Sequence, residues 1–222
     1  MKAHYYFDWF TNALPKQVAD LLLNDLPERK SLVTVSAYPP DDEGDQSDFN
    51  TITGEWLNPA GITFDEYHII NQKVSKEKAH ELLRNASAIF LTGGYTPLQN
   101  AFINEYELHI PIKESNATAI MGASSGTMNM SKYWICSKWL TTGTRQSTEE
   151  CIIYEGLGLD NFAIEAHFDP ENTGLLENVL KPLSQKLDVY ATCWDSTIRV
   201  KNGKIEIFGE VYLISGSKIQ KM

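Results

Sequence analysis

The stretch Thr118-Ala-Ile-Met-Gly-Ala-Ser-Ser-Gly126 places a short apolar run directly before a serine that lies between two glycines. The apolar run predicts a buried strand, and we expect a helix to follow it from about Gly126 to Ile135. The glycines allow a sharp backbone turn without Cβ clashes. Such a turn would hold the Ser124 hydroxyl clear of the sheet and predicts a nucleophile. The alternative is a strand-to-helix turn whose small residues serve packing alone.

Segments on both sides of this turn alternate between strand-like and helix-like patterns. Strands are predicted at residues 31–37, 65–70, 86–92 and 161–166, and helices at 76–84, from 97 onward and at 173–183. Short strands follow at 189–192, 197–201 and 204–208, with a hairpin turn at Lys201-Asn-Gly203. This order predicts an α/β fold of three layers, flavodoxin-like or class I glutamine amidotransferase-like. Its mostly parallel sheet carries helices on both faces, and a β-hairpin lies near the C-terminus.

The composition sets limits on the class of protein. The 222 residues are 42% hydrophobic and predict a single domain over residues 1–222 with a substantial core. A formal net charge of −10 disfavours nucleic acid and anionic membrane surfaces as partners. No transmembrane run or signal peptide is recognisable, so a cytoplasmic protein is expected. Three widely spaced cysteines predict neither a disulfide framework nor a zinc site, and we expect no metal or cofactor.

Two further elements could serve a serine nucleophile. Thr92-Gly-Gly-Tyr-Thr96 also follows a predicted strand, and a glycine N–H there could form an oxyanion hole with the Ser125 amide. A phosphate-binding or structural turn is the alternative, although no glycine-rich phosphate motif is present. His167 ends the strand 161–166, where sheets of this class place their sites, and is the candidate general base.

Spacing alone does not choose the acid that would orient His167. We take Asp195 because it begins an apolar alternation near strand ends. Glu149 and Glu150, in a predicted loop, and Asp169 are the alternatives. Any of these carboxylates could instead be a solvated surface charge.

In this order, the elements resemble peptidase family S51, the dipeptidase E and cyanophycinase group, whose fold is similar to that of class I glutamine amidotransferases. The matching stretches are Ile89-Phe-Leu-Thr-Gly-Gly-Tyr-Thr96, Ile120-Met-Gly-Ala-Ser-Ser-Gly126, and Gly156-Leu-Gly-Leu-Asp160 leading into His167-Phe168. The resemblance implies that Ser124 is the nucleophile and His167 its base. It also implies an oxyanion hole formed by Gly94 and the Ser125 amide. The expected function is a serine peptidase or amidohydrolase that cleaves a small peptide-like amide. Family members are often dimers, so a homodimer is one expected assembly.

Several positions depart from the family pattern. Tyr95 replaces an asparagine and Ser125 an alanine, and Lys138-Trp-Leu-Thr-Thr-Gly143 lacks the acid that dipeptidase E carries in this region. The stretch 169–177 has no arginine or lysine, so a carboxylate-bearing substrate would meet like charge there. Aspartyl dipeptides and cyanophycin are therefore disfavoured as substrates. The alternative function is a catalytically impaired S51-like binding or regulatory protein. A glutaminase is disfavoured because it would need a cysteine in place of Ser124.

Overall fold

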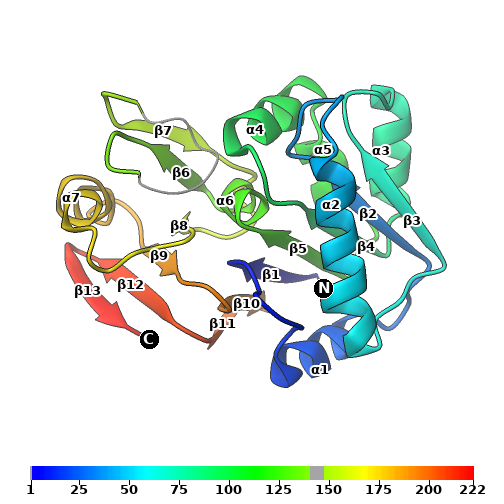
Figure 1. The fold of residues 1–222 in the computed structure, drawn as a ribbon, viewed down its shortest axis with the longest axis horizontal. Coiled ribbons are helices and arrows are strands. Elements are labelled where there is room, and N and C mark those ends of the chain that lie inside the picture. Colours follow the sequence, from blue (N-terminus) through cyan, green and yellow to red (C-terminus); the bar gives the residue numbers. More distant parts are fainter. Residues whose placement is uncertain (1, 141–147) are drawn as a thin grey trace.

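The computed structural model describes residues 2–140 and 148–222 and arranges them as two β-sheets with helices around and between them (Figure 1). Of the stretch 138–143, in which the sequence shows no carboxylate, residues 141–143 lie outside the described ranges. Among the described helices, none has the length and apolar character needed to cross a bilayer.

The first sheet has seven strands and a parallel centre. Its spatial order is β11 (Lys204–Phe208), β10 (Thr197–Lys201), β1 (Ala3–Phe7), β5 (Ala119–Ala123), β4 (Ala88–Leu91), β2 (Ser31–Val35) and β3 (Glu66–Ile70). The five strands from β1 to β3 in this order are mutually parallel, whereas β10 and β11 form an antiparallel hairpin at the edge, as the sequence predicts. Because parallel strands end at the same edge, the residues that follow β1, β4 and β5 meet there.

Helices cover both faces of this sheet because its strands are apolar on both faces. One face packs against α1 (Lys16–Asp25) and a continuous helical segment made of α2 (Gly44–Asn50), η1 (Thr51–Leu57) and η2 (Asn58–Ala60). The other face packs against α3 (Lys76–Asn85), α4 (Thr96–Glu105), α5 (His109–Glu114) and α6 (Ser125–Met130). The predicted α/β class is confirmed.

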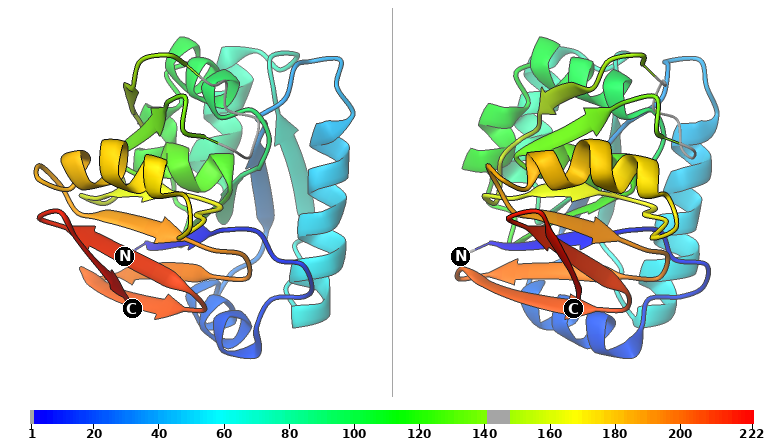
Figure 2. Two further views of the ribbon diagram at one scale, coloured as in Figure 1. Left: turned by 60° about the vertical axis from the view of Figure 1, so that its left-hand side comes forward. Right: turned by 90° about the vertical axis from the view of Figure 1, so that its left-hand side faces the viewer.

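A second, six-stranded sheet lies beside the first, where the sequence predicts only one sheet. Its order is β13 (Lys218–Lys221), β12 (Val211–Ser215), β9 (Val189–Thr192), β8 (Ala163–Glu165), β6 (Tyr133–Cys136) and β7 (Ile152–Glu155). β6, β8 and β9 are parallel and the other pairs are antiparallel. The segment α7 (Thr173–Leu175), η3 (Leu176–Leu180) and α8 (Lys181–Leu183) lies across this sheet (Figure 2).

The prediction of a helix through Ile135 was wrong. Helix α6 ends at Met130, and the backbone turns extended at Ser131, whose hydroxyl donates to the Met128 carbonyl at 2.8 Å. The following Tyr133–Cys136 pairs with β7 and β8 instead of continuing the helix. Its β-branched and aromatic residues suit a buried strand, and sheet pairing overrides the helical pattern.

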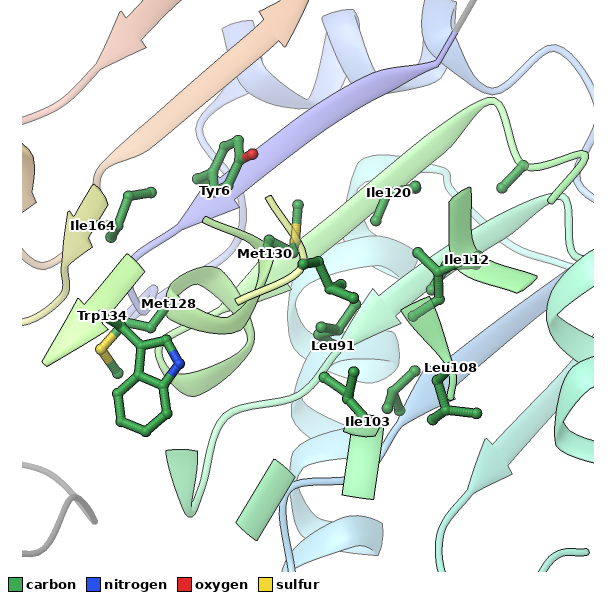
Figure 3. Close-up of a cluster of buried hydrophobic side chains, with 14 of the residues drawn as sticks. Tyr6, Leu91, Ile103, Leu108, Ile112, Ile120, Met128, Met130, Trp134 and Ile164 are labelled. Carbon is green, nitrogen blue, oxygen red and sulfur yellow. The ribbon is translucent and has the colours of Figure 1, made fainter. Parts of the chain in front are cut away.

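The short helix α6 is buried between the two sheets (Figure 3). Met128 and Met130 join one apolar cluster with Tyr6 of the first sheet and with Trp134 and Ile164 of the second. All six residues of α6 are buried. The position of the residue that precedes this helix is therefore set by packing from both sheets.

A buried ion cluster fastens α1 to the hairpin. Asp25, which is 4% exposed, accepts hydrogen bonds from Arg199 Nε at 2.8 Å, from Lys201 Nζ at 2.6 Å and from the Tyr5 hydroxyl at 2.6 Å. Burial opposes ionisation of this carboxyl, but the hydrogen bonds from Lys201, Tyr5 and Arg199 outweigh burial and lower its pKa.

We expect Asp25→Ala to lower the free energy of unfolding by about 3–5 kcal/mol, because it removes the buried carboxylate shared by Arg199 and Lys201 and leaves Glu206 as the remaining acidic partner of Arg199. Since the pKa of Asp25 is lowered, its stabilisation is present at neutral pH and is lost as the pH falls through that value. Urea unfolding at pH 7 and at strongly acidic pH measures both effects. The control Glu28→Gln removes an exposed pair with Lys30 and should cost at most about 1 kcal/mol. Equal losses in both variants would contradict the expectation.

Candidate active site

Ser124 lies on a sharp turn between β5 and α6. Its backbone has φ 50° and ψ −108°, a strained conformation for a residue with a side chain. Its N–H donates to the Asp8 carbonyl at 2.9 Å, and its own carbonyl accepts from the Met128 N–H at 3.1 Å. The turn is thereby held against the end of β1.

The two glycines around Ser124 are required by close approach. A Cβ on Gly126 would lie 2.0 Å from the Leu91 carbonyl oxygen at the end of β4. A Cβ on Gly122 would lie 2.7 Å from the carbonyl carbon of Gly126. Only glycine lets α6 start this close to the sheet, which is the physical basis of the motif in the sequence.

His167 reaches Ser124 from the second sheet. It follows β8, with φ 56°, and its Nε2 lies 2.7 Å from Ser124 Oγ. Its side chain is 14% exposed, so the imidazole is not fully enclosed by the protein. The structure thus brings together the two residues that the sequence analysis singled out.

Asp8, at the end of β1, lies on the other side of the imidazole. Its Oδ1 is 2.6 Å from His167 Nδ1, and its side chain is completely buried. Its Oδ2 accepts from the His167 backbone N–H at 2.7 Å and from the Thr192 hydroxyl at 2.6 Å. Within the described part of the chain, the nearest charged partner of His167 Nδ1 is thus Asp8 Oδ1, although the two atoms are not aligned as a regular hydrogen bond.

The acids named in the sequence analysis lie elsewhere. The Asp195 carboxylate accepts from the Thr11 N–H at 2.7 Å, and Asp169 Oδ1 accepts from the Glu171 N–H at 2.9 Å. Glu149 and Glu150 are exposed. The structure therefore places Asp8 where the sequence analysis expected Asp195.

A signal for Asp8 is present in the sequence. It is the one acid inside the apolar run Tyr5-Tyr-Phe-Asp-Trp-Phe10, directly after a strand. A charge in such a run needs a buried partner. Its partner lies 159 residues away, so the run alone does not identify it.

The Gly93-Gly94 turn after β4 lies beside the serine turn. The buried Ser125 hydroxyl donates to the Gly94 carbonyl and lies 2.9 Å from the Thr96 hydroxyl. Gly94 has φ +111°, a conformation that residues with side chains rarely adopt. One residue, Ser125, therefore links the two turns that the sequence analysis assigned to an oxyanion hole. This contact also gives a structural use to a serine where the family pattern has alanine.

A second buried carboxylate, which the sequence analysis did not single out, borders the Gly93-Gly94 turn. Asp48 Oδ2 and the Trp9 ring both pack against the Gly93 α-carbon, where an added Cβ would lie 3.1 and 2.8 Å from them. Burial raises the pKa of Asp48 to about 6; hydrogen bonds from the Tyr38 hydroxyl and the Gly93 N–H partly oppose the rise, and the Asp45 charge adds to it. Gly93 thus lies against a carboxylate that is costly to ionise.

Cys193 directly follows Thr192, whose hydroxyl donates to Asp8. Burial, with smaller effects from Glu210 and Asp8, raises the pKa of its thiol to about 11. Its Sγ donates to the Phe168 carbonyl at 3.3 Å. The thiol is therefore protonated at neutral pH, and its chemistry is not that of a thiolate nucleophile.

A cavity of about 470 Å³ is lined by residues such as Lys113, Lys132 and Asp160, and its lining does not include Ser124, His167 or Asp8. Within residues 2–140 and 148–222, no group of three or more histidine, cysteine, aspartate or glutamate side chains is placed to hold a metal ion. The contacts of Ser124 and His167 locate the candidate site.

A comparison with family models matches residues 35–208 to peptidase family S51. The chain belongs to peptidase family S51. The matched range includes Ser124 and His167. It begins at residue 35 and therefore does not include Asp8. Membership of this family supports a peptidase activity for the chain. No curated protein matches the chain in a sequence search.

Two solved structures described as peptidases have a fold similar to that of this chain. A peptidase from an acI-B1 Actinobacterium has a TM-score of 0.71 and 15% identity, with 100% of this chain and 94% of that chain covered. A candidate peptidase E protein from Listeria monocytogenes EGD-e has a TM-score of 0.61 and 15% identity, with 94% and 98% covered. At this level of identity, the likeness establishes the fold.

The raised pKa of Asp48 predicts a pH-dependent cost to stability. The unfolded carboxyl ionises near 3.8 and the folded one near 6, so the folded state is penalised as the pH rises from 4 to 6. We expect Asp48→Asn to be more stable than the wild type at pH 7 by about 1–3 kcal/mol and to lose this advantage at pH 4. Urea unfolding at both pH values checks this, with the exposed Asp65→Asn as control. A difference that does not change with pH would contradict it.

Proposed function

We propose that this S51 member is a serine peptidase that cleaves a small peptide-like amide through Ser124, His167 and Asp8. The observation that carries the proposal is the unbroken chain of contacts from Ser124 Oγ to His167 Nε2 and from Nδ1 to Asp8. Nucleophile, base and orienting acid in this geometry define a catalytic triad irrespective of fold or chain order. Asp8 takes the place that the sequence analysis gave to Asp195.

The geometry supports a definite sequence of steps. His167 Nε2 takes the proton of Ser124 Oγ as the oxygen attacks the substrate carbonyl carbon. The Asp8 carboxylate holds the ring in place and stabilises the positive charge that forms on it. His167 then gives the proton to the leaving amine. Water repeats the attack on the acyl-enzyme, which releases the acid and restores Ser124.

The backbone amides of Gly94 and Ser125 are proposed to receive the oxyanion. The contact between the Ser125 hydroxyl and the Gly94 carbonyl supports this role, because it fixes one turn relative to the other. The N-terminus of α6 adds a partial positive charge directly after the nucleophile. Each such donor typically contributes about 10²- to 10³-fold to the rate.

The triad contacts also bear on the alternative of a catalytically impaired protein. That alternative was supported by the stretch 138–143, which lacks the acid that dipeptidase E carries after its serine. Asp8 supplies a carboxylate from β1 instead, and burial without a catalytic partner would be costly for it. The arrangement therefore favours a peptidase that retains its chemistry.

Ser124→Ala should abolish covalent labelling of the folded protein by a fluorophosphonate, because no other hydroxyl in the described residues contacts His167 Nε2. In-gel fluorescence of a tagged fluorophosphonate measures this, and circular dichroism confirms the fold. Ser47→Ala, an exposed serine on α2, is the control and should label like the wild type. Labelling that survives in Ser124→Ala would sink the assignment. A folded wild type that does not label would instead favour the non-catalytic alternative.

Asp8→Asn should lower the rate of fluorophosphonate labelling by about 10³- to 10⁴-fold, because an amide cannot stabilise the imidazolium and favours the wrong tautomer. Asparagine has nearly the same shape, so thermal melting should still show a cooperative fold. Glu149→Gln, which changes an exposed acid named in the sequence analysis, serves as control and should label at the wild-type rate. A larger loss in Glu149→Gln than in Asp8→Asn would overturn the role of Asp8.

A further inference from the structure

Trp194 is the most exposed of the large hydrophobic side chains in the described residues. It lies in the turn between β9 and β10, with 55% of its surface open to solvent, whereas Thr192 and Ser196 on either side are completely buried. Its ring lies against His167, with the ring centroids 5.0 Å apart and the planes inclined by 32°. An exposed indole beside a proton-transferring imidazole can contact whatever binds there.

Hydrogen bonds of Asp195 hold the turn that carries Trp194. Asp195 has φ 61°, in the left-handed region, and its N–H donates to the Trp9 carbonyl at 3.0 Å. Its carboxylate accepts from the N–H of Thr11 at 2.7 Å and from the Thr11 hydroxyl at 2.9 Å. These bonds fix the backbone next to Trp194, and the indole contacts His167 in the absence of a substrate. Preorganised aromatic groups of this kind lose little entropy on binding.

Trp194 lies on the side of the scissile bond where the leaving amine would be. In the proposed mechanism, His167 Nε2 gives its proton to the leaving amine. The amine nitrogen of the substrate must therefore come within hydrogen-bond reach of the imidazole. The side chain of the residue that carries the amine then extends from a point beside the imidazole. Because the indole packs on the same imidazole, such a side chain can reach it. The acyl part of the substrate is held at Ser124 and at the oxyanion turn.

The charged residues near the turn that carries Trp194 limit the kind of substrate side chain that could bind there. Asp169 and Glu171 follow His167, and Asp195 follows Trp194, so the charged residues next to these two rings in the chain are acidic. A leaving residue with a carboxylate side chain would meet like charge there, whereas an apolar side chain would bury the exposed indole.

We propose that Trp194, positioned by Asp195, forms the subsite for the leaving residue and selects an apolar or aromatic side chain there. This inference rests on the proposed serine peptidase function. It gives Asp195 a positioning role in place of the triad role expected from the sequence.

The subsite can be tested by running the second half of the reaction with different amines. p-Nitrophenyl acetate acylates Ser124 and releases p-nitrophenol. An amino-acid amide then attacks the acetyl carbon: its amine proton passes to His167 Nε2 and on to Ser124 Oγ, the carbon–Oγ bond breaks, and an N-acetyl amino-acid amide forms. Phenylalanine, leucine, glycine and aspartate amides compete with water for the same acyl-enzyme, and chromatography of the products gives their ratios.

The wild type should prefer phenylalanine and leucine amides to glycine amide, and glycine amide to aspartate amide. Trp194→Ala should lower the phenylalanine-to-glycine product ratio by about tenfold or more, which is the discrimination typical of apolar subsites. Trp194→Phe should keep most of the preference. Ile219→Ala, which removes an exposed apolar side chain on β13, is the matched control and should leave the ratio unchanged.

The product ratio separates a subsite from a structural effect. A disturbance of His167 would slow every amine equally and leave the ratio unchanged. A ratio that stays within twofold in Trp194→Ala, or a wild type that prefers aspartate amide, would overturn the subsite while the proposed function stands. A folded wild type that neither hydrolyses p-nitrophenyl acetate nor labels with a fluorophosphonate would overturn both.

Discussion

The carboxylate of Asp8 is the group on which the rest of the site depends. A fully buried carboxylate is costly unless hydrogen bonds and a nearby positive or polarisable group compensate for the lost hydration. Asp8 obtains this compensation from the His167 backbone and ring and from the Thr192 hydroxyl. Asp8 directly follows β1 of the first sheet, whereas His167 follows β8 and Thr192 ends β9 of the second sheet. The same contacts that stabilise the charge therefore align the two sheets and set the imidazole beside Ser124.

The serine turn is held from several directions by packing. Helix α6 is enclosed by both sheets, and Gly126 lies too close to β4 for any side chain. Ser125 joins this turn to the Gly93-Gly94 turn. Ser124, His167 and Asp195 all have positive φ, and each is at or beside the proposed site. Strain of this kind persists only where surrounding contacts hold it in place, and it often accompanies a functional geometry.

The electrostatic character of this region is acidic. Asp8 is buried at the imidazole, Asp48 borders the Gly93-Gly94 turn, and the chain as a whole carries a formal net charge of −10. A substrate that adds a carboxylate to such a site would be repelled, whereas a neutral or apolar one would not. Exposed aromatic rings near the Gly93-Gly94 turn could contact such a neutral or apolar substrate. Tyr95, in the family's asparagine position, is 41% exposed and packs edge-on against Tyr38.

What the sequence determined by itself is local in origin. The strand, glycine turn and helix around Ser124, the position of His167 after a strand, and the Asn202-Gly203 hairpin all follow from residues that are neighbours in the chain. Backbone preferences and hydrophobic periodicity act over such short ranges, so these features can be predicted. The family resemblance rested on the same local motifs.

The tertiary structure alone decided which distant residues meet. Whether Asp8 or Asp195 contacts His167 depends on strand order, because Asp8 is 159 residues from His167 and Thr11 is 184 residues from Asp195. The second sheet and the end of α6 at Met130 likewise depend on pairing between β6, β7 and β8, which outweighs the local helical pattern. The folded core decides which residue lies beside a buried carboxylate. The spacing of residues along the chain contains no information on that geometry.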